Sequence, residues 1–175
     1  MKPTILLTLG LALSLASCTE KETETTDTPS TQTTATNEVD EILLKEAPKE
    51  AVKISDLRKV GKPGDEVTFS GAVIGSKQVF VDGRAVMIMG DPTKISACDE
   101  HCATPWDVCC DDRDVIKASI LTVQVLNEDG QQLKTNLKGV GGLKELSSLT
   151  VTGVVAEGSS PTNMIINATG IYVHP

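Results

Sequence analysis

The segment from Gly90 to Asp114 most constrains what this chain can fold into, because it holds Cys98, Cys102, Cys109 and Cys110. It also contains seven acidic residues against two basic ones, together with the single tryptophan of the chain. Such a segment has too few apolar side chains to form a core of its own. We therefore expect the cysteines to organise it, and the flanking strands to support it as an acidic loop.

The first interpretation is that two disulfides fasten this loop, as in many small secreted lobes. Cys109 and Cys110 are neighbours in the chain, and their Cα atoms are too close for a relaxed bridge between them. Cys98 and Cys102 would then each pair with one of these two, and the sequence leaves the pairing unknown. Each bridge would contribute about 2–4 kcal/mol by restricting the unfolded chain.

The alternative interpretation is a metal site. Four thiolates, or three thiolates with His101, could surround Zn(II) or Cu(I), which prefer soft ligands. However, the spacing Cys98-x3-Cys102-x6-Cys109-Cys110 lacks the Cys-x2-Cys pairs of structural zinc sites, and oxidation competes with metal binding outside the cell. Thiol–disulfide exchange is a third alternative, which the flanking acids disfavour because they raise a thiol pKa. The sequence thus favours disulfides over a metal site, and it predicts no cofactor. We expect the acidic side chains to form a solvated face.

The first eighteen residues indicate the compartment. Lys2 precedes an apolar run over 5–15, which is too short to span a membrane and is typical of a secretion signal. The segment Leu15-Ala16-Ser17-Cys18 resembles the lipobox of bacterial lipoproteins. This resemblance implies a signal peptide over 1–17, cleavage before Cys18, and lipidation of Cys18 by several acyl chains, which anchor a protein firmly. The alternative is an ordinary cleavable signal with a coincidental cysteine.

The lipoprotein resemblance implies a protein anchored by lipid outside the cytoplasm, in the cell envelope or periplasm. The residue after the lipidated cysteine is Thr19 and not an aspartate. In lipoproteins of two-membrane bacteria, this resemblance implies export to the outer membrane. The membrane would then be one partner, and an unknown envelope protein or small ligand the other. Residues 18–37 are rich in Thr and Glu and cannot bury enough surface to fold, so we expect a disordered tether.

The remaining chain reads as a linker followed by one domain. Residues 38–50 are expected to form a short helix over 38–47 and then a linker, and residues 51–175 the domain. Alternating apolar residues, bounded by turn signals, predict strands at 66–74, 79–89, 118–126, 149–155 and 164–173. A hairpin arm is expected at 131–137 and a short helix at 143–147. Gly71 and Gly153 lie in the middle of predicted strands, which indicates bends or bulges.

The strand order, with its glycine bend, resembles an oligonucleotide/oligosaccharide-binding (OB) fold over roughly 52–173. This resemblance implies a mainly β protein, a small five-stranded barrel with one short helix, and a Cys-rich loop (90–114) between the second and third strands. The segment from Trp106 to Cys110 is also similar to uncharacterised secreted bacterial proteins, a likeness that implies no activity.

Three functional hypotheses follow. The first is a lipid-anchored, non-enzymatic binding or structural module that presents a disulfide-pinned loop. The second is a metal-handling lipoprotein that uses the four cysteines. The third is OB-type binding of nucleic acid or an oligosaccharide. A net charge of −8 makes a nucleic-acid partner unlikely because binding to phosphates relies on Lys and Arg, and aromatic residues for base stacking make up only 2% of the chain.

Individual residues add little to this choice. Trp106 is a weak candidate for ligand stacking, and we favour it as the core of its loop. His101 and His174 have no serine or acid at a recognisable spacing, so we predict no catalytic residue and no enzyme.

Overall fold

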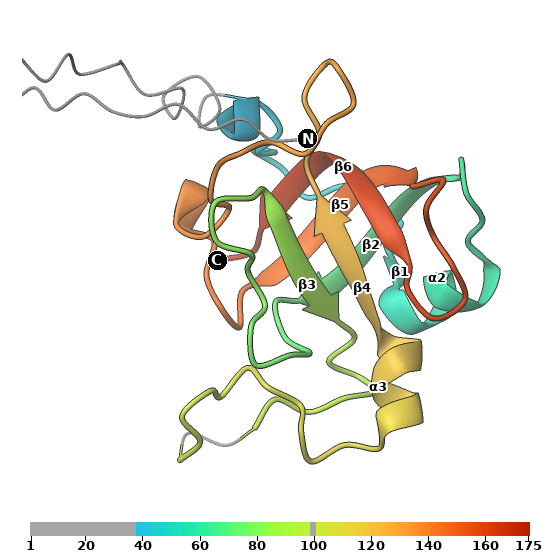
Figure 1. The fold of residues 1–175 in the computed structure, drawn as a ribbon, viewed down its shortest axis with the longest axis vertical. Coiled ribbons are helices and arrows are strands. Elements are labelled where there is room, and N and C mark those ends of the chain that lie inside the picture. The colour runs from blue at the N-terminus through green and yellow to red at the C-terminus, as the bar shows by residue number, and fades with distance from the viewer. Residues whose placement is uncertain (1–37, 99–100) are drawn as a thin grey trace, which may run out of the picture.

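The computed structural model describes residues 38–98 and 101–175, so the predicted signal peptide, Cys18 and the tether lie outside the described part. Within it, β2 (Glu66–Ala72), β3 (Val86–Gly90), β4 (Ile120–Gln124), β5 (Ser148–Val155) and β6 (Ile165–Val173) form a barrel (Figure 1). The strands neighbour one another in the order β2-β3-β4-β6-β5, and β5 pairs back with β2 to close the barrel. Of these pairs, only β4 and β6 run parallel. The predicted five-stranded, OB-like barrel is confirmed.

The Cys-rich loop lies between β3 and β4, and not between strands 2 and 3 as predicted. The numbering shifts because a two-residue strand, β1 (Val52–Lys53), precedes the barrel and pairs in parallel with β2. Two residues are too few for an alternating pattern to be visible in the sequence. The loop still connects the two barrel strands that follow β2.

The described chain has more short helices than the single one that the OB resemblance implied. Residues 38–41 are helical, α2 (Ile54–Val60) and α3 (Arg113–Ser119) flank the barrel strands, and η1 (Val140–Gly142) is a single 3-10 turn. No helix of residues 38–98 and 101–175 is long and apolar enough to cross a membrane.

Of three predictions about local structure, two were wrong and one was right only in part. The helix expected over 38–47 ends at 41, because the next residues pair with β6: Leu44 N donates to Ile171 O at 2.8 Å, and Ile171 N donates to Ile42 O at 2.8 Å. The hairpin arm expected at 131–137 is present only at its start, where Gln132 forms an antiparallel bridge with Leu126 and Leu133 N donates to Val125 O at 3.0 Å. The helix expected at 143–147 is replaced by η1, which lies just before it.

The core is mainly aliphatic and lies inside the barrel. Its fully buried members come from every barrel strand and include Phe69, Met87, Val123, Val151 and Ile166. The predicted irregularity at Gly153 is present, because the β5–β6 register shifts between Thr152 and Gly153. All five barrel strands therefore contribute to one core.

Gly71 serves a different purpose from the bend that was expected. A Cβ atom at Gly71 would overlap the Ile54 side chain and lie 2.8 Å from the Gly90 carbonyl oxygen. The missing side chain therefore lets α2 pack directly on β2, close to the point where the Cys-rich loop leaves β3.

Candidate functional site

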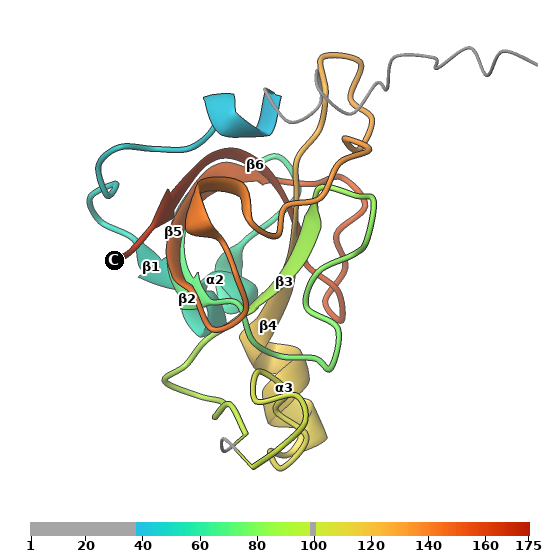
Figure 2. The ribbon, with the colours of Figure 1, turned by 90° about the vertical axis from the view of Figure 1, so that its left-hand side faces the viewer.

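The segment over 91–112, which we call the Cys lobe, leaves the end of β3 and returns to the barrel through α3. Figures 1 and 2 both show its described part projecting from one end of the barrel, opposite the end where residues 38–41 lie. The lobe is therefore presented away from the point at which the described chain begins.

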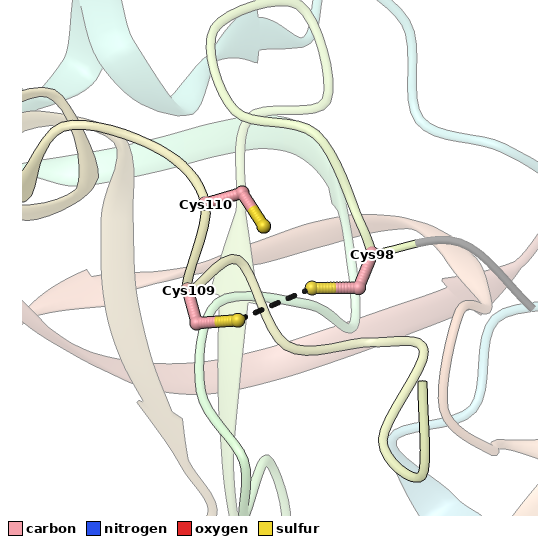
Figure 3. A group of neighbouring side chains, drawn as sticks. All are labelled: Cys98, Cys109 and Cys110. Carbon is pink, nitrogen blue, oxygen red and sulfur yellow. Dashed lines mark hydrogen bonds between the residues drawn. The ribbon is translucent and has the colours of Figure 1, made fainter. Parts of the chain in front are cut away.

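Three cysteines of the Cys lobe form a thiol cluster. The Sγ atoms of Cys98, Cys109 and Cys110 all lie within 4.8 Å of one another, and those of Cys98 and Cys109 are 3.5 Å apart (Figure 3). A disulfide bond is about 2.05 Å long, so these sulfurs stand as separate thiols, and no disulfide joins the four described cysteines. Cys102 and His101, which the sequence also suggested as ligands, are not members of this cluster.

The cluster is accessible to solvent, and one of its thiols, that of Cys109, holds its proton tightly. Cys98 is half-buried, whereas Cys109 and Cys110 are exposed. Hydrogen bonding to the Cys98 thiol, and then to that of Cys110, raises the pKa of Cys109 to about 12. The thiolate is the form of cysteine that binds a metal. Cys109 would therefore become a thiolate only when a bound ion displaces its proton.

Backbone hydrogen bonds hold the two arms of the lobe together. Cys98 N donates to Asp107 O at 2.9 Å, and Asp107 N donates to Thr104 O at 2.9 Å. The turn from Thr104 to Asp107 therefore folds the chain back, so that Cys109 and Cys110 face Cys98. This fold-back brings residues eleven positions apart into contact.

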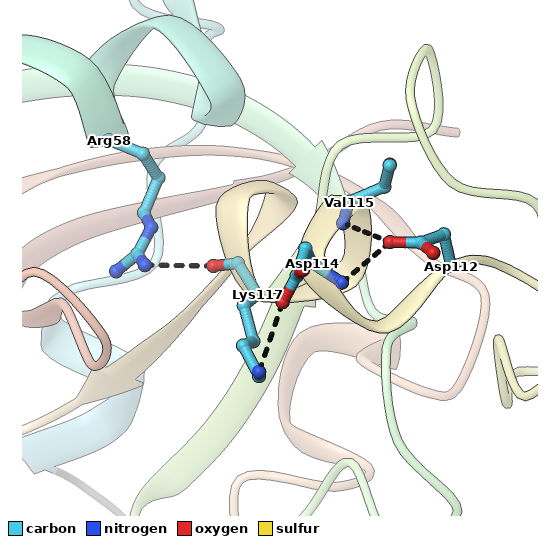
Figure 4. Close-up of polar contacts among 5 residues, drawn as sticks. All are labelled: Arg58, Asp112, Asp114, Val115 and Lys117. Atoms are coloured by element: carbon cyan, nitrogen blue, oxygen red, sulfur yellow. Dashed lines mark hydrogen bonds and ion pairs between the residues drawn. The ribbon is translucent and has the colours of Figure 1, made fainter.

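Several acids of the lobe cap backbone groups, a role that the sequence analysis missed when it described a solvated face. Asp111 Oδ2 accepts from Ser96 N at 2.7 Å, and Asp107 Oδ1 accepts from Val108 N at 2.8 Å. Asp112 Oδ1 accepts from the N–H groups of residues 114 and 115 at 2.8 and 3.3 Å, and so caps α3 (Figure 4). An aspartate just before a helix is a known start signal, and this one could have revealed α3.

Asp91 is buried at the junction between the lobe and α2. It is 1% exposed, and its carboxylate accepts from Ser55 N at 3.1 Å, from Thr93 N at 2.9 Å and from Thr93 Oγ1 at 2.7 Å. Burial alone would raise the pKa of Asp91, but the hydrogen bonds from Ser55 and Thr93 outweigh it and lower the pKa to about 2. The carboxylate thus fastens the start of the lobe to α2.

Trp106 packs in the way that the sequence favoured. A small second core comprises Ala72, Ile74, Ile95 and Val108, against which Trp106, Ile116 and Ile120 pack. The Trp106 indole Nε1 donates to Lys77 O at 3.0 Å, and Gly75 N donates to Trp106 O at 3.1 Å. The lobe therefore has a core after all, formed with residues that lie outside it.

Arg58 and His174 make their contacts outside the Cys lobe. Arg58 Nη2 on α2 donates to Lys117 O at 2.8 Å (Figure 4) and to Pro161 O at 2.9 Å, which ties α3 and the β5–β6 loop to α2. His174 lies far along the chain, where its Nε2 is 2.9 Å from Thr150 Oγ1 and its ring meets Tyr172 edge-on. His174 thus belongs to the β5–β6 end of the barrel and takes no part in the thiol cluster.

Comparisons with known proteins found a structural likeness but no sequence family. No family model matches the chain, and no curated protein matches it either. One solved structure that resembles it is described as "OBody AM1L10 bound to hen egg-white lysozyme". The alignment covers 74% of this chain and 98% of that one, with 14% sequence identity and a TM-score of 0.38.

Proposed function

We propose that this protein is a lipid-anchored, non-enzymatic binding module of the bacterial cell envelope that binds a thiophilic metal ion through Cys98, Cys109 and Cys110. The observation that carries the proposal is the convergence of three sulfurs within 4.8 Å of one another at an exposed end of the barrel. Cysteines that are eleven positions apart meet there through a defined turn, so the cluster is built into the fold.

The distances suit ligands around one ion. Two sulfurs bound tetrahedrally at about 2.3 Å from a metal lie about 3.8 Å apart. The Sγ atoms of Cys98 and Cys109 are already 3.5 Å apart, so little movement is required for both to reach one ion. Adjacent Cys109 and Cys110, which are unsuited to bridging each other, can both serve as ligands of one ion.

The proposed location follows from the sequence. The lipobox resemblance implies that acyl chains on Cys18 hold the chain in a membrane, the outer membrane in a two-membrane bacterium. The Cys lobe projects from the end of the barrel opposite residues 38–41, which follow the tether in the chain (Figure 2). That arrangement would present the thiol cluster away from the lipid surface, toward an envelope protein or a small ligand that delivers or accepts the ion.

A second candidate is the disulfide-pinned recognition loop. The observation that favours it is the same 3.5 Å between the Cys98 and Cys109 sulfurs, since a shift of about 1.5 Å would bring them to bonding distance. In an oxidising compartment these two thiols would lose two protons and two electrons to an oxidant and form one bridge. The lobe would then bind by shape and charge, and the sulfurs would serve only to fix it.

One sample separates the two candidates. The full chain is expressed in a bacterium that processes lipoproteins, and is extracted from membranes in detergent without reductant. Elemental analysis should find about one Cu or Zn ion per chain. Once a chelator has removed the ion, the lobe cysteines should react with an alkylating reagent, which shows that they are free thiols. In the triple variant C98S/C109S/C110S the metal is expected to be lost.

The same preparation carries the control for the anchor. Cys18→Ser should move the protein from the membrane to the soluble fraction without changing its metal content, because Cys18 is not one of the three proposed ligands. Metal-free protein in which peptide mapping finds Cys98 and Cys109 joined would reject metal binding in favour of the second candidate.

A further inference from the structure

We infer that the thiol cluster is a three-coordinate Cu(I) site, with Cys98, Cys109 and Cys110 as its ligands. This inference rests on the proposed function and deepens it, because it names the ion and the number of ligands. The structural features that point to it are an all-sulfur donor set, a ligand count of three, and an exposed position.

The donor set selects a soft ion. No carboxylate or imidazole belongs to the group of ligand atoms that lie within 4.8 Å of one another among the described residues. Among the described acids of the lobe, Asp107, Asp111 and Asp112 each accept hydrogen bonds from backbone N–H groups. Hard cations such as Ca²⁺ and Mg²⁺ need several oxygen ligands, so an all-thiolate cluster disfavours them.

The number of ligands separates Cu(I) from Zn(II). Structural zinc is almost always held by four protein ligands in a tetrahedron. Cu(I), with one charge and a filled d shell, is satisfied by two or three thiolates. Three sulfurs placed symmetrically at about 2.3 Å from an ion lie about 4.0 Å apart, which falls between the observed 3.5 Å and the 4.8 Å limit of the cluster.

The position of the cluster suits exchange of the ion. Two of its three cysteines, Cys109 and Cys110, are exposed, and the third is half-buried. A closed structural metal site is instead surrounded by the protein. An ion held at the surface by consecutive cysteines is open to attack by a thiolate of another carrier, so the geometry points to uptake or delivery of Cu(I).

The test combines wild-type protein with a matched pair of cysteine variants. The full lipidated chain, reduced and kept anaerobic in detergent, is titrated with Cu(I) against a coloured Cu(I) chelator. We expect one ion per chain, and X-ray absorption at the copper edge should show three sulfur neighbours. Cys110→Ser should weaken Cu(I) binding by on the order of 100-fold or more, whereas Cys102→Ser, also an exposed cysteine of the lobe, should change it less than about threefold.

Two other outcomes would separate a failure of the Cu(I) assignment from a failure of metal binding as a whole. Four ligands at the metal, with Cys102→Ser as damaging as Cys110→Ser, would overturn the three-coordinate Cu(I) assignment and leave metal binding standing. Failure of the reduced wild type to bind either Cu(I) or Zn(II) would overturn both this inference and the proposed function. Because the absorption spectrum is taken on wild-type protein, the coordination number does not depend on the variants folding, and circular dichroism checks that they do.

Discussion

Replacing Gly153 with alanine is expected to lower the free energy of unfolding by about 3 kcal/mol, because the added methyl group has no space in the barrel. A Cβ at this position would overlap the Asn167 carbonyl oxygen and lie 2.8 Å from Ile166 Cγ2. A backbone carbonyl cannot rotate away as a side chain can, so the β5–β6 pairing must shift. A urea titration followed by circular dichroism would report the change as a lower midpoint.

Gly158 offers the matched control. It lies in the β5–β6 loop, and a Cβ there would meet no heavy atom within 4 Å. Gly158→Ala should therefore leave the free energy of unfolding within about 0.5 kcal/mol of wild type. Equal urea midpoints for Gly153→Ala and Gly158→Ala would contradict this prediction, because they would mean that the register shift between β5 and β6 tolerates a side chain at position 153.

Replacing Asp91 with asparagine is expected to lower the free energy of unfolding by about 2 kcal/mol at pH 7. The pKa of Asp91 falls from an ordinary 3.8 to about 2 in the folded protein, and each pKa unit corresponds to about 1.4 kcal/mol. Asparagine keeps the size of the side chain but not the charge, and its NH2 group replaces one of the two oxygens that accept from Ser55 N and Thr93 N, so one of these hydrogen bonds is lost.

The effect of Asp91 should depend on pH in a defined direction. Because its folded-state pKa lies below that of the unfolded chain, the stabilisation is present above about pH 4 and is lost as the pH falls toward about 2. The difference between wild type and Asp91→Asn in urea titrations should thus shrink between pH 5 and pH 3. Asp82→Asn, at an exposed position, serves as the control; a gap for Asp91→Asn that stays constant over this range would contradict the account.

The barrel could be predicted from the sequence because its strands alternate. The pattern at 66–74 and 149–155 is regular, and mid-strand glycine at 71 and 153 marks the close approaches that the structure shows. The short elements could not be predicted in this way: β1 has only two residues, and residues 42–44 pair with β6 because of the tertiary fold, despite an apolar spacing that favours a helix.

The candidate site was predicted in composition but not in geometry. The sequence identified the cysteines and left their partners open, because spacing along the chain does not determine where a loop folds back. The fold-back depends on the hydrogen bond from Cys98 N to Asp107 O and on the packing of Trp106 against the small second core. Likewise, Asp91 looked like one of seven surface acids until its burial against α2 was visible.

The most direct test of the central claim, that Cys98, Cys109 and Cys110 act together as ligands, is a native mass spectrum of the full chain taken from the membrane without reductant. We expect the native spectrum to show a lipid-modified protein that carries one copper ion. After denaturation, the mass should be that of the metal-free chain with every lobe cysteine still a thiol. A metal-free chain that is about 4 Da lighter, as two disulfides would make it, would contradict the claim.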